Sequence, residues 1–206
     1  MDCYRIIVTG GAGYIGSHFC KRASSYGHKI SVIDNLITGK KEFVRWGKLY
    51  FGDVRNEDFL REKFLEIKPD FIVHFAASAY VSESLLKPLE YISNNIDGMR
   101  SVCKVSSEFK IPIVFSSSCS VYGEVKKVPI CELTELNPLS PYGETKLFCE
   151  KMLKWCEDVY GLRWVSLRYF NASGADSELE IGENHDPETH IIPLAIKALG
   201  KNGKVL

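Results

Sequence analysis

The 206-residue chain has no excess of charge of either sign, no long apolar run and no paired cysteines. Its 26 basic residues balance its 26 acidic ones, which excludes a broad electrostatic attraction to nucleic acid or to a membrane surface. No segment is apolar over the roughly 20 residues that a helix needs to cross a bilayer, and the first residues lack the pattern of a secretion signal. We therefore expect neither a nucleic-acid partner nor a membrane partner.

The seven cysteines are odd in number, are scattered along the chain and form no C-x-x-C pair. This pattern is typical of free thiols in a reducing compartment rather than of a disulfide framework. Together with the missing secretion signal, it predicts a cytoplasmic protein. Cys119 is either a reactive thiol or, as is more common for cysteine, a small packing residue.

Short apolar runs alternate with helical patterns along the chain, which is typical of a parallel sheet with crossover helices. The expected strands span residues 5–9, 29–33, 48–51, 70–75, 111–116 and 162–169, and the expected helices span residues 14–26, 57–67, 88–109, 142–160 and 191–199. Asn56 is expected to cap the second helix, residues 124–141 and 171–188 are expected to be loops, and residues 200–206 resemble the start of a further strand. The sequence thus predicts an α/β fold with a Rossmann-type doubly wound parallel sheet in residues 1–170, followed by the start of a small C-terminal substrate-binding domain in residues 171–206.

A glycine-rich turn follows the first expected strand and opens the first expected helix. The segment TGGAGYIG places Gly10 at the tight turn, Gly13 where a pyrophosphate must approach the backbone, and Gly16 where the helix packs closely. The helix N-terminus then offers free N–H groups and a positive dipole end to phosphates. The alternative is a tight strand–helix turn with no ligand.

Asp34 strengthens the prediction of a dinucleotide site. It follows the second expected strand, about 20 residues after the glycines, where an acid binds the adenosine ribose hydroxyls. A carboxylate there repels the additional phosphate of NADP, so NAD is the expected cofactor. Asp53, after the third strand, either contacts the adenine or caps the next helix.

Ser118, Tyr142 and Lys146 are the candidate catalytic residues. Tyr142 and Lys146 are four residues apart, so they share one face of a helix. A phenol ionises too weakly to act as a base at neutral pH, but a lysine ammonium and a positive nicotinamide ring beside it favour the phenolate. Ser118 follows a buried strand, at the carboxyl edge where ligands bind in open α/β sheets. Without that context, a tyrosine and a lysine at this spacing are an ordinary surface pair.

Five motifs occur in order: VTGGAGYIGSH, HFAASAYVSES, FSSSCSVYGE, SPYGETK and LRYFNASGA. Together they resemble the extended short-chain dehydrogenase/reductase family and, within it, the UDP-glucose 4-epimerases, from residue 5 to the end of the chain. The resemblance implies that Ser118, Tyr142 and Lys146 are catalytic, with Tyr142 as the base and Lys146 also holding the nicotinamide ribose. It implies substrate contacts at Ser118, Tyr142, Asn171 and His190. The expected cofactor contacts are Gly10, Gly13, Tyr14, Ile15, Gly16, Asp34, Asn35, Leu36, Ile37, Thr38, Gly39, Asp53, Val54, Phe75, Ala76, Ala77, Asn94, Ser116, Tyr142, Lys146, Tyr169 and Phe170.

The resemblance also implies a reaction. A retained NAD accepts hydride from C4 of a UDP-hexose while Tyr142 takes the hydroxyl proton, and the 4-keto sugar receives the hydride again on its other face. It implies a homodimer built on the helices at residues 88–109 and 142–160. The alternative is that the apolar stripes of these helices only face the sheet.

Two departures from the family pattern leave alternatives open. Ala79 stands where many such epimerases have a basic residue, and family members continue well beyond the length of this chain. An NAD-binding fragment without turnover is therefore one alternative, and another sugar-nucleotide enzyme is a second. Dehydratases place a carboxylic acid pair where this chain has Cys119 and Ser120, so dehydration is disfavoured. His185 and His190 lie among acids, but their spacing fits no standard metal motif, and no metal is expected.

Overall fold

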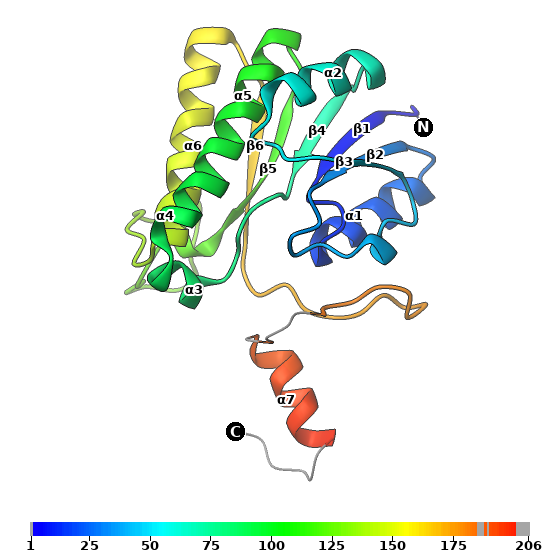
Figure 1. Cartoon of the computed structure of the whole chain (residues 1–206). Coiled ribbons are helices and arrows are strands. Elements are labelled where there is room, and N and C mark those ends of the chain that lie inside the picture. The colour runs from blue at the N-terminus through cyan, green and yellow to red at the C-terminus, as the bar shows by residue number, and fades with distance from the viewer. Residues whose placement is uncertain (1, 185–187, 189, 201–206) are drawn as a thin grey trace.

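The computed structural model describes residues 2–184, 188 and 190–200 (Figure 1). Its described residues form a parallel sheet of six strands in the order β3-β2-β1-β4-β5-β6. The strands are β1 (Arg5–Thr9), β2 (Lys29–Asp34), β3 (Lys48–Phe51), β4 (Phe71–His74), β5 (Ile113–Ser118) and β6 (Trp164–Tyr169). The chain runs outward from β1 to β3 and then crosses to β4, so the direction of winding reverses between β1 and β4. All six carboxyl ends therefore meet at one edge, and the reversal opens a crevice there.

Helices cover both faces of the sheet (Figure 1). The α-helices of the described residues are α1 (Tyr14–Ser25), α2 (Glu57–Ile67), α3 (Val81–Leu86), α4 (Pro88–Tyr91), α5 (Asp97–Phe109), α6 (Pro141–Tyr160) and α7 (Ile191–Gly200), and a π-helical turn η2 (Ile92–Ile96) joins α4 to α5. Successive residues of a strand point to opposite faces. Ile6 and Val8 accordingly pack with Cys20 of α1, whereas Ile7 packs with Phe64 of α2 and Leu153 of α6.

Most of the predicted elements are confirmed, including the bounds of β1 and β3 and the N-cap of α2. The Asn56 side chain accepts a hydrogen bond from the Phe59 amide at 3.0 Å. Asp53 is therefore not the cap, and that alternative was wrong. The described part of residues 171–184 is irregular, as expected. The predicted strand at residues 200–206 and the role of His185 lie outside the described residues.

Several predicted bounds or elements were wrong, among them the start of β5, which lies at Ile113 rather than at 111. β5 ends at Ser118 rather than at 116, because Ser116, Ser117 and Ser118 all pair in register with β6. β6 begins at Trp164 rather than at the predicted residue 162. The helix expected over residues 88–109 contains the π-helical turn η2, and the short helix α3 was not predicted. The uniform helical periodicity of this region gives no signal for an extra residue in one turn.

In the described part of the chain, none of the helices combines the length and the apolarity that a membrane span requires. The segment between β6 and α7 runs below α1 at the carboxyl edge of the sheet, and α7 lies beyond that edge (Figure 1). The carboxyl edge, the N-terminus of α1 and this segment together surround the candidate site.

Candidate active site

The turn after β1 brings backbone closer to backbone than any side chain allows. Gly10 has a φ of +71°, and a Cβ there would lie 2.5 Å from the Ala76 nitrogen. A Cβ on Gly16 would lie 2.3 Å from the Gly10 oxygen. Both glycines are therefore required by the turn itself, and they seat α1 directly against β1 and β4.

The N-terminus of α1 is open to an anion. Gly13 is its N-cap and supplies no side-chain hydrogen bond, and no acidic residue occupies its first turn. The first amides of the helix therefore keep the dipole end positive and hold no competing carboxylate. Such a cradle of glycine backbone suits the pyrophosphate of a dinucleotide.

Asp34 is the last residue of β2, and backbone amides of two loops donate hydrogen bonds to its carboxylate. Oδ2 accepts a hydrogen bond from the Ala12 amide at 3.0 Å, and Oδ1 accepts one from the Leu36 amide at 2.8 Å. Burial raises the pKa of Asp34, and these two backbone hydrogen bonds oppose the rise. Its side chain is fixed beside the glycine turn, where an acceptor for ribose hydroxyls is needed.

Asp53 is engaged by its neighbours rather than left open. Arg55 contacts both carboxylate oxygens, at 2.9 and 2.7 Å, and the Asn35 amide donates to Oδ2 at 3.1 Å. The Arg55 guanidinium lowers the pKa of Asp53 to about 2. The predicted adenine contact of Asp53 stays a prediction.

Two adjoining cavities follow the carboxyl edge of the sheet. The first, of about 390 Å³, extends from Val54 and Asp34 to the glycine turn, and the second, of about 740 Å³, extends from the glycine turn to Ser118, Tyr142 and Lys146. They share Gly10 and Gly13 in their walls. Together they form an elongated groove across the point where the strand order reverses, as the extended shape of a dinucleotide requires.

Nearly all predicted site residues line this groove. Leu36 and Asp53 do not, and both lie on the loops just behind its wall. The structure also brings in residues that the sequence reasoning missed: Lys40, Phe43, Arg55, Ser78, Tyr80, Glu83, Ser93 and Glu183. Their positions just after β2, β3 or β4, or on the helices and loops that follow, were the available signal, since such segments collect at this edge.

The catalytic candidates come from the first turns of α6 and the end of β5. Ser140 caps α6 by accepting a hydrogen bond from the Gly143 amide at 3.1 Å, and Pro141 occupies the tolerated first position. This cap sets where the helix begins, and so places Tyr142 and Lys146 on the turns that face β5. Both side chains are more than nine-tenths buried.

Lys146 is held by the sheet. Its Nζ donates to the Ser116 carbonyl of β5 at 2.8 Å, and lies 5.0 Å from the centre of the Phe115 ring and 5.7 Å from that of Tyr142. Its charge therefore lies beside the phenol, as the shared helix face predicted. Ser118 accepts a hydrogen bond from the Ser120 amide at 3.1 Å and lines the same cavity.

A buried asparagine in η2 joins the two sides of the site, and no sequence signal pointed to it. The Asn95 side chain accepts from the Ser78 amide at 2.8 Å and donates to the Ser78 carbonyl at 3.1 Å. It also donates to Thr145 Oγ1 at 3.1 Å, one residue from Lys146. The π-helical turn thereby ties the loop after β4 to the catalytic helix.

A second buried network fastens α6 to β5 and β6. Arg168 donates to both carboxylate oxygens of Glu150, at 3.0 and 2.6 Å, and Ser117 donates to the same carboxylate at 2.6 Å. Burial acts against ionisation, but these contacts leave the pKa of Glu150 lowered. Ser117 precedes Ser118, so this network fixes the strand end that carries the candidate serine.

His74 ends β4 and is a neutral core residue. Its Nδ1 lies 2.7 Å from Thr9 Oγ1 and its ring stacks on Phe115. Burial lowers the pKa of His74 to about 3, and the Lys146 charge acts in the same direction. Cys119 packs against the small cluster of Val121 and Leu147, and burial raises its pKa, which favours the packing role over the reactive one.

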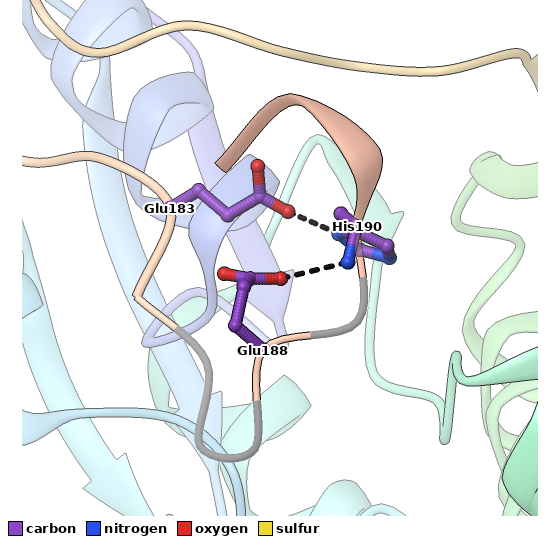
Figure 2. Close-up of side chains that lie close together, drawn as sticks. All are labelled: Glu183, Glu188 and His190. Atoms are coloured by element: carbon purple, nitrogen blue, oxygen red, sulfur yellow. Dashed lines mark hydrogen bonds and ion pairs between the residues drawn. The ribbon is translucent and has the colours of Figure 1, made fainter. Parts of the chain in front are cut away.

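His190 lies at the rim of the larger cavity with two acids (Figure 2). Its Nδ1 contacts the Glu183 carboxylate, and its backbone amide donates to Glu188 at 2.9 Å. In the described residues, Glu183, Glu188 and His190 form one group close enough to share a cation, and Asp176, Glu178 and Glu180 form another. The second group is filled by the Lys21 ammonium.

A model of the NAD-dependent epimerase/dehydratase family matches residues 6–206. The chain belongs to this family. The predicted fold class, an α/β fold with a Rossmann-type parallel sheet, is confirmed. The family includes both epimerases and dehydratases, so membership of the family does not by itself choose between these two activities.

The relatives narrow the resemblance to one branch of the family. The chain is 47% identical to the UDP-glucose 4-epimerase of Lacticaseibacillus casei over 194 residues, which are 93% of this chain and 59% of that protein. It matches the crystal structure of the Brucella ovis UDP-glucose 4-epimerase in complex with NAD with a TM-score of 0.94 and 46% identity, over 98% of this chain and 62% of that one. It matches the Bifidobacterium longum UDP-glucose 4-epimerase in complex with NAD⁺ and UDP with a TM-score of 0.88 and 33% identity, over 97% and 64%. The predicted resemblance to the UDP-glucose 4-epimerases is confirmed, and the chain spans about three fifths of their length.

Proposed function

We propose that this chain binds NAD along the groove and that the complete protein interconverts UDP-hexoses at sugar C4. The observation that carries the proposal is that Ser118, Tyr142 and Lys146 line the same cavity as Gly13 and the open N-terminus of α1. A dinucleotide cradle and a proton-transfer set in one cavity are what alcohol oxidation by hydride transfer requires. The similarity to NAD-bound UDP-glucose 4-epimerases supports this assignment.

The groove fits NAD at three places. The glycine turn takes the pyrophosphate on backbone amides, Asp34 accepts from the adenosine ribose, and Lys146 and Tyr142 face the nicotinamide end. The Asp34 carboxylate beside the ribose disfavours NADP through repulsion of the additional phosphate. When bound, NAD supplies the acceptor for the hydride at sugar C4 and the donor that returns it to the other face.

The chain's own residues move the proton. Tyr142 as phenolate takes the proton of the C4 hydroxyl while the C4–H bond breaks, and returns it when the carbonyl is reduced. Lys146 stabilises the phenolate by its charge, since its ammonium lies beside the phenol ring. Ser118 donates a hydrogen bond to the sugar oxygen as charge develops there. Positions 119 and 120 hold a cysteine and a serine, where the dehydratases have a pair of carboxylic acids. The site therefore does not favour loss of water from the sugar.

The proposed substrate contacts of this chain are Asn171 and His190, which line the larger cavity. Further substrate contacts are expected from the part of the relatives that this chain does not span. For the 206-residue chain alone, the competing proposal is NAD binding without turnover. The two are separated by incubating the purified chain and the complete protein with UDP-galactose, following the anomeric NMR signals of UDP-glucose, and measuring bound NAD. Product from the complete protein supports epimerisation. Bound NAD without product in either form contradicts it and leaves a binding module.

We further propose a homodimer in which α6 meets its copy. The apolar face of α5 packs into the core, since Met99, Val102 and Val105 are fully buried. α6 instead leaves Trp155 at 54% and Val159 at 70% exposure. Leu85 and Leu86 at the end of α3 and Leu89 in α4 are exposed as well. An apolar surface of this kind is typical of an interface.

Light scattering tests the dimer. Trp155→Lys is expected to shift the complete protein to the monomer mass without loss of fold, because Trp155 is 54% exposed and its ring packs edge-on against the ring of Phe148, which is itself 39% exposed. Lys151→Ala, on the same helix, is the matched control. A monomer mass for the unchanged protein contradicts the dimer.

We also propose a cytoplasmic location, supported by seven cysteines that are all free thiols.

A further inference from the structure

Residues 174–181, hereafter the strap, lie against α1 although more than 150 residues separate them along the chain (Figure 1). The strap is a closed turn, because the Asp176 amide donates to the Ile181 carbonyl and the Leu179 amide donates to the Asp176 carbonyl, both at 2.9 Å. Ile181 is buried, and polar contacts join the strap to α1 at Tyr14 and at Lys21.

One lysine holds three acids of the strap. Lys21 Nζ lies 2.7 Å from Asp176, 2.5 Å from Glu178 and 2.8 Å from Glu180. Without a cation, three carboxylates this close repel one another. Partial burial opposes the charge of Lys21, but the three hydrogen bonds leave its pKa raised, and the same contacts lower the pKa of Asp176 and of Glu180. The conformation of the strap therefore depends on the Lys21 charge.

Two further contacts extend this attachment. Arg45 pairs with Glu180 at 3.0 Å, and the Trp46 ring centre lies 5.3 Å from Lys21 Nζ. At the other end of α1, the Tyr14 hydroxyl donates to the Gly174 carbonyl at 2.7 Å. The strap is thus attached beside the glycine turn and again two helical turns further along α1.

The ends of the strap reach the cavity that the glycine turn lines. Asn171 and Ala172 precede the strap, Glu183 and Asn184 follow it, and all four line the larger cavity with Gly13 and Gly16. The strap therefore joins two stretches of chain that form this side of the cavity, so its attachment to α1 bears on the cavity wall next to the glycine turn.

We propose that Lys21 is a positioning residue that fastens the strap to α1 and thereby slows the release of NAD from the groove. The proposal rests on the proposed NAD binding and extends it to cofactor retention. Lys21 touches neither of the two cavities, so its effect on the cofactor acts only through the strap.

The test replaces Lys21 by Met, which keeps the length of the side chain and removes the charge. In the complete protein loaded with NAD, we expect the release rate of NAD to rise about tenfold, with a smaller change in the association rate. Added salt is expected to speed release from the unchanged protein and to have little effect on the Lys21→Met variant. Lys21→Arg is expected to restore slow release.

Hydrogen exchange supplies a readout that does not depend on the cofactor. The Asp176 and Leu179 amides are expected to exchange faster in Lys21→Met than in the unchanged protein. Lys63→Met is the matched control, because Lys63 on α2 also binds two carboxylates, at 2.7 and 3.1 Å, and lies on the opposite face of the sheet. It is expected to change neither readout.

The outcomes separate the two proposals. Faster exchange in the strap with unchanged NAD release overturns the retention role of Lys21 and leaves the proposed function intact. Unchanged exchange in the strap overturns the attachment itself. An unchanged protein that binds no NAD overturns the proposed function, and the retention role with it.

Discussion

The sheet of residues 5–169 and the segment of residues 171–184 meet at the same groove, yet the first is packed by apolar side chains and the second is held by ion pairs. Ile7, Ile72 and Phe115 are almost fully buried in the sheet. The segment buries Ile181 but otherwise depends on Lys21, Arg45 and Tyr14. Apolar packing is dense and insensitive to salt, whereas exposed charge pairs are weak and screened.

This difference matches the tasks that the proposed function gives the two regions. The proposed proton and hydride transfer needs fixed atoms, and Ser118 stands on β5 while Tyr142 and Lys146 stand on α6, which packs on the sheet. The proposed exchange of a nucleotide sugar needs a wall that opens at a small free-energy cost, and surface ion pairs are suited to such a wall.

The largest effect is expected from removing one oxygen. Tyr142→Phe should lower kcat for the proposed epimerisation by about 1,000-fold or more, because it removes the hydroxyl that takes and returns the proton. NAD binding and stability should change little, since the ring is kept. Tyr160→Phe, at the exposed end of the same helix, is the control. Near-normal turnover of Tyr142→Phe would contradict the assigned base.

The next effect concerns the close approach of backbone in the glycine turn. Gly16→Ala places a Cβ 2.3 Å from the Gly10 oxygen. It should cost about 3 kcal/mol of unfolding free energy, or prevent folding, because backbone at that contact cannot yield cheaply. Gly182→Ala, whose Cβ would meet Ala175 at an ordinary 3.4 Å, should stay within about 0.5 kcal/mol. Urea titrations of both variants measure the contrast, and equal costs would refute it.

Buried His74 gives the sheet a pH dependence. Its pKa is lowered to about 3 in the folded chain, whereas an unfolded histidine titrates near about 6.5. Between these values only the unfolded chain binds the proton, so stability falls as pH falls through this window. The loss from this residue should reach about 2 kcal/mol between about pH 6.5 and pH 5.

The measurement compares His74→Asn with the unchanged chain by urea unfolding at both pH values. The variant lacks the titrating ring, so its stability should fall less in acid by that amount. It starts lower at neutral pH, because the stacking on Phe115 is lost. Parallel pH profiles for the two proteins would show that His74 does not titrate as described.

The smallest effect is expected at the ribose end. Asp34→Asn keeps an oxygen acceptor but loses the charge and one of the two backbone-bonded carboxylate oxygens. NAD affinity should fall about tenfold, and the preference for NAD over NADP should shrink, because the repulsion of the additional phosphate is removed. Calorimetric titrations with both cofactors test this. Unchanged affinity for both would reject the ribose assignment.

The sheet and both halves of the site could be predicted because their signals are local. The glycines at 10, 13 and 16, the strand runs and the Tyr142–Lys146 spacing each lie within one turn or one element. Asn95 could not be predicted, because a π-helical turn changes which side chains face inward without changing the composition. The strap could not be predicted either, since Lys21 meets acids 155 to 159 positions away. Acidic loops are common, and no spacing rule names their partner.

The central claim is that hydride leaves sugar C4 and returns to the same carbon while Tyr142 carries the proton. The most direct measurement uses UDP-galactose labelled with deuterium at C4 and the complete protein in ordinary water. The account predicts UDP-glucose that keeps the deuterium at C4, and no product from Tyr142→Phe. Product that has exchanged the label for solvent hydrogen would contradict it, because the hydrogen would then have left C4 as a proton.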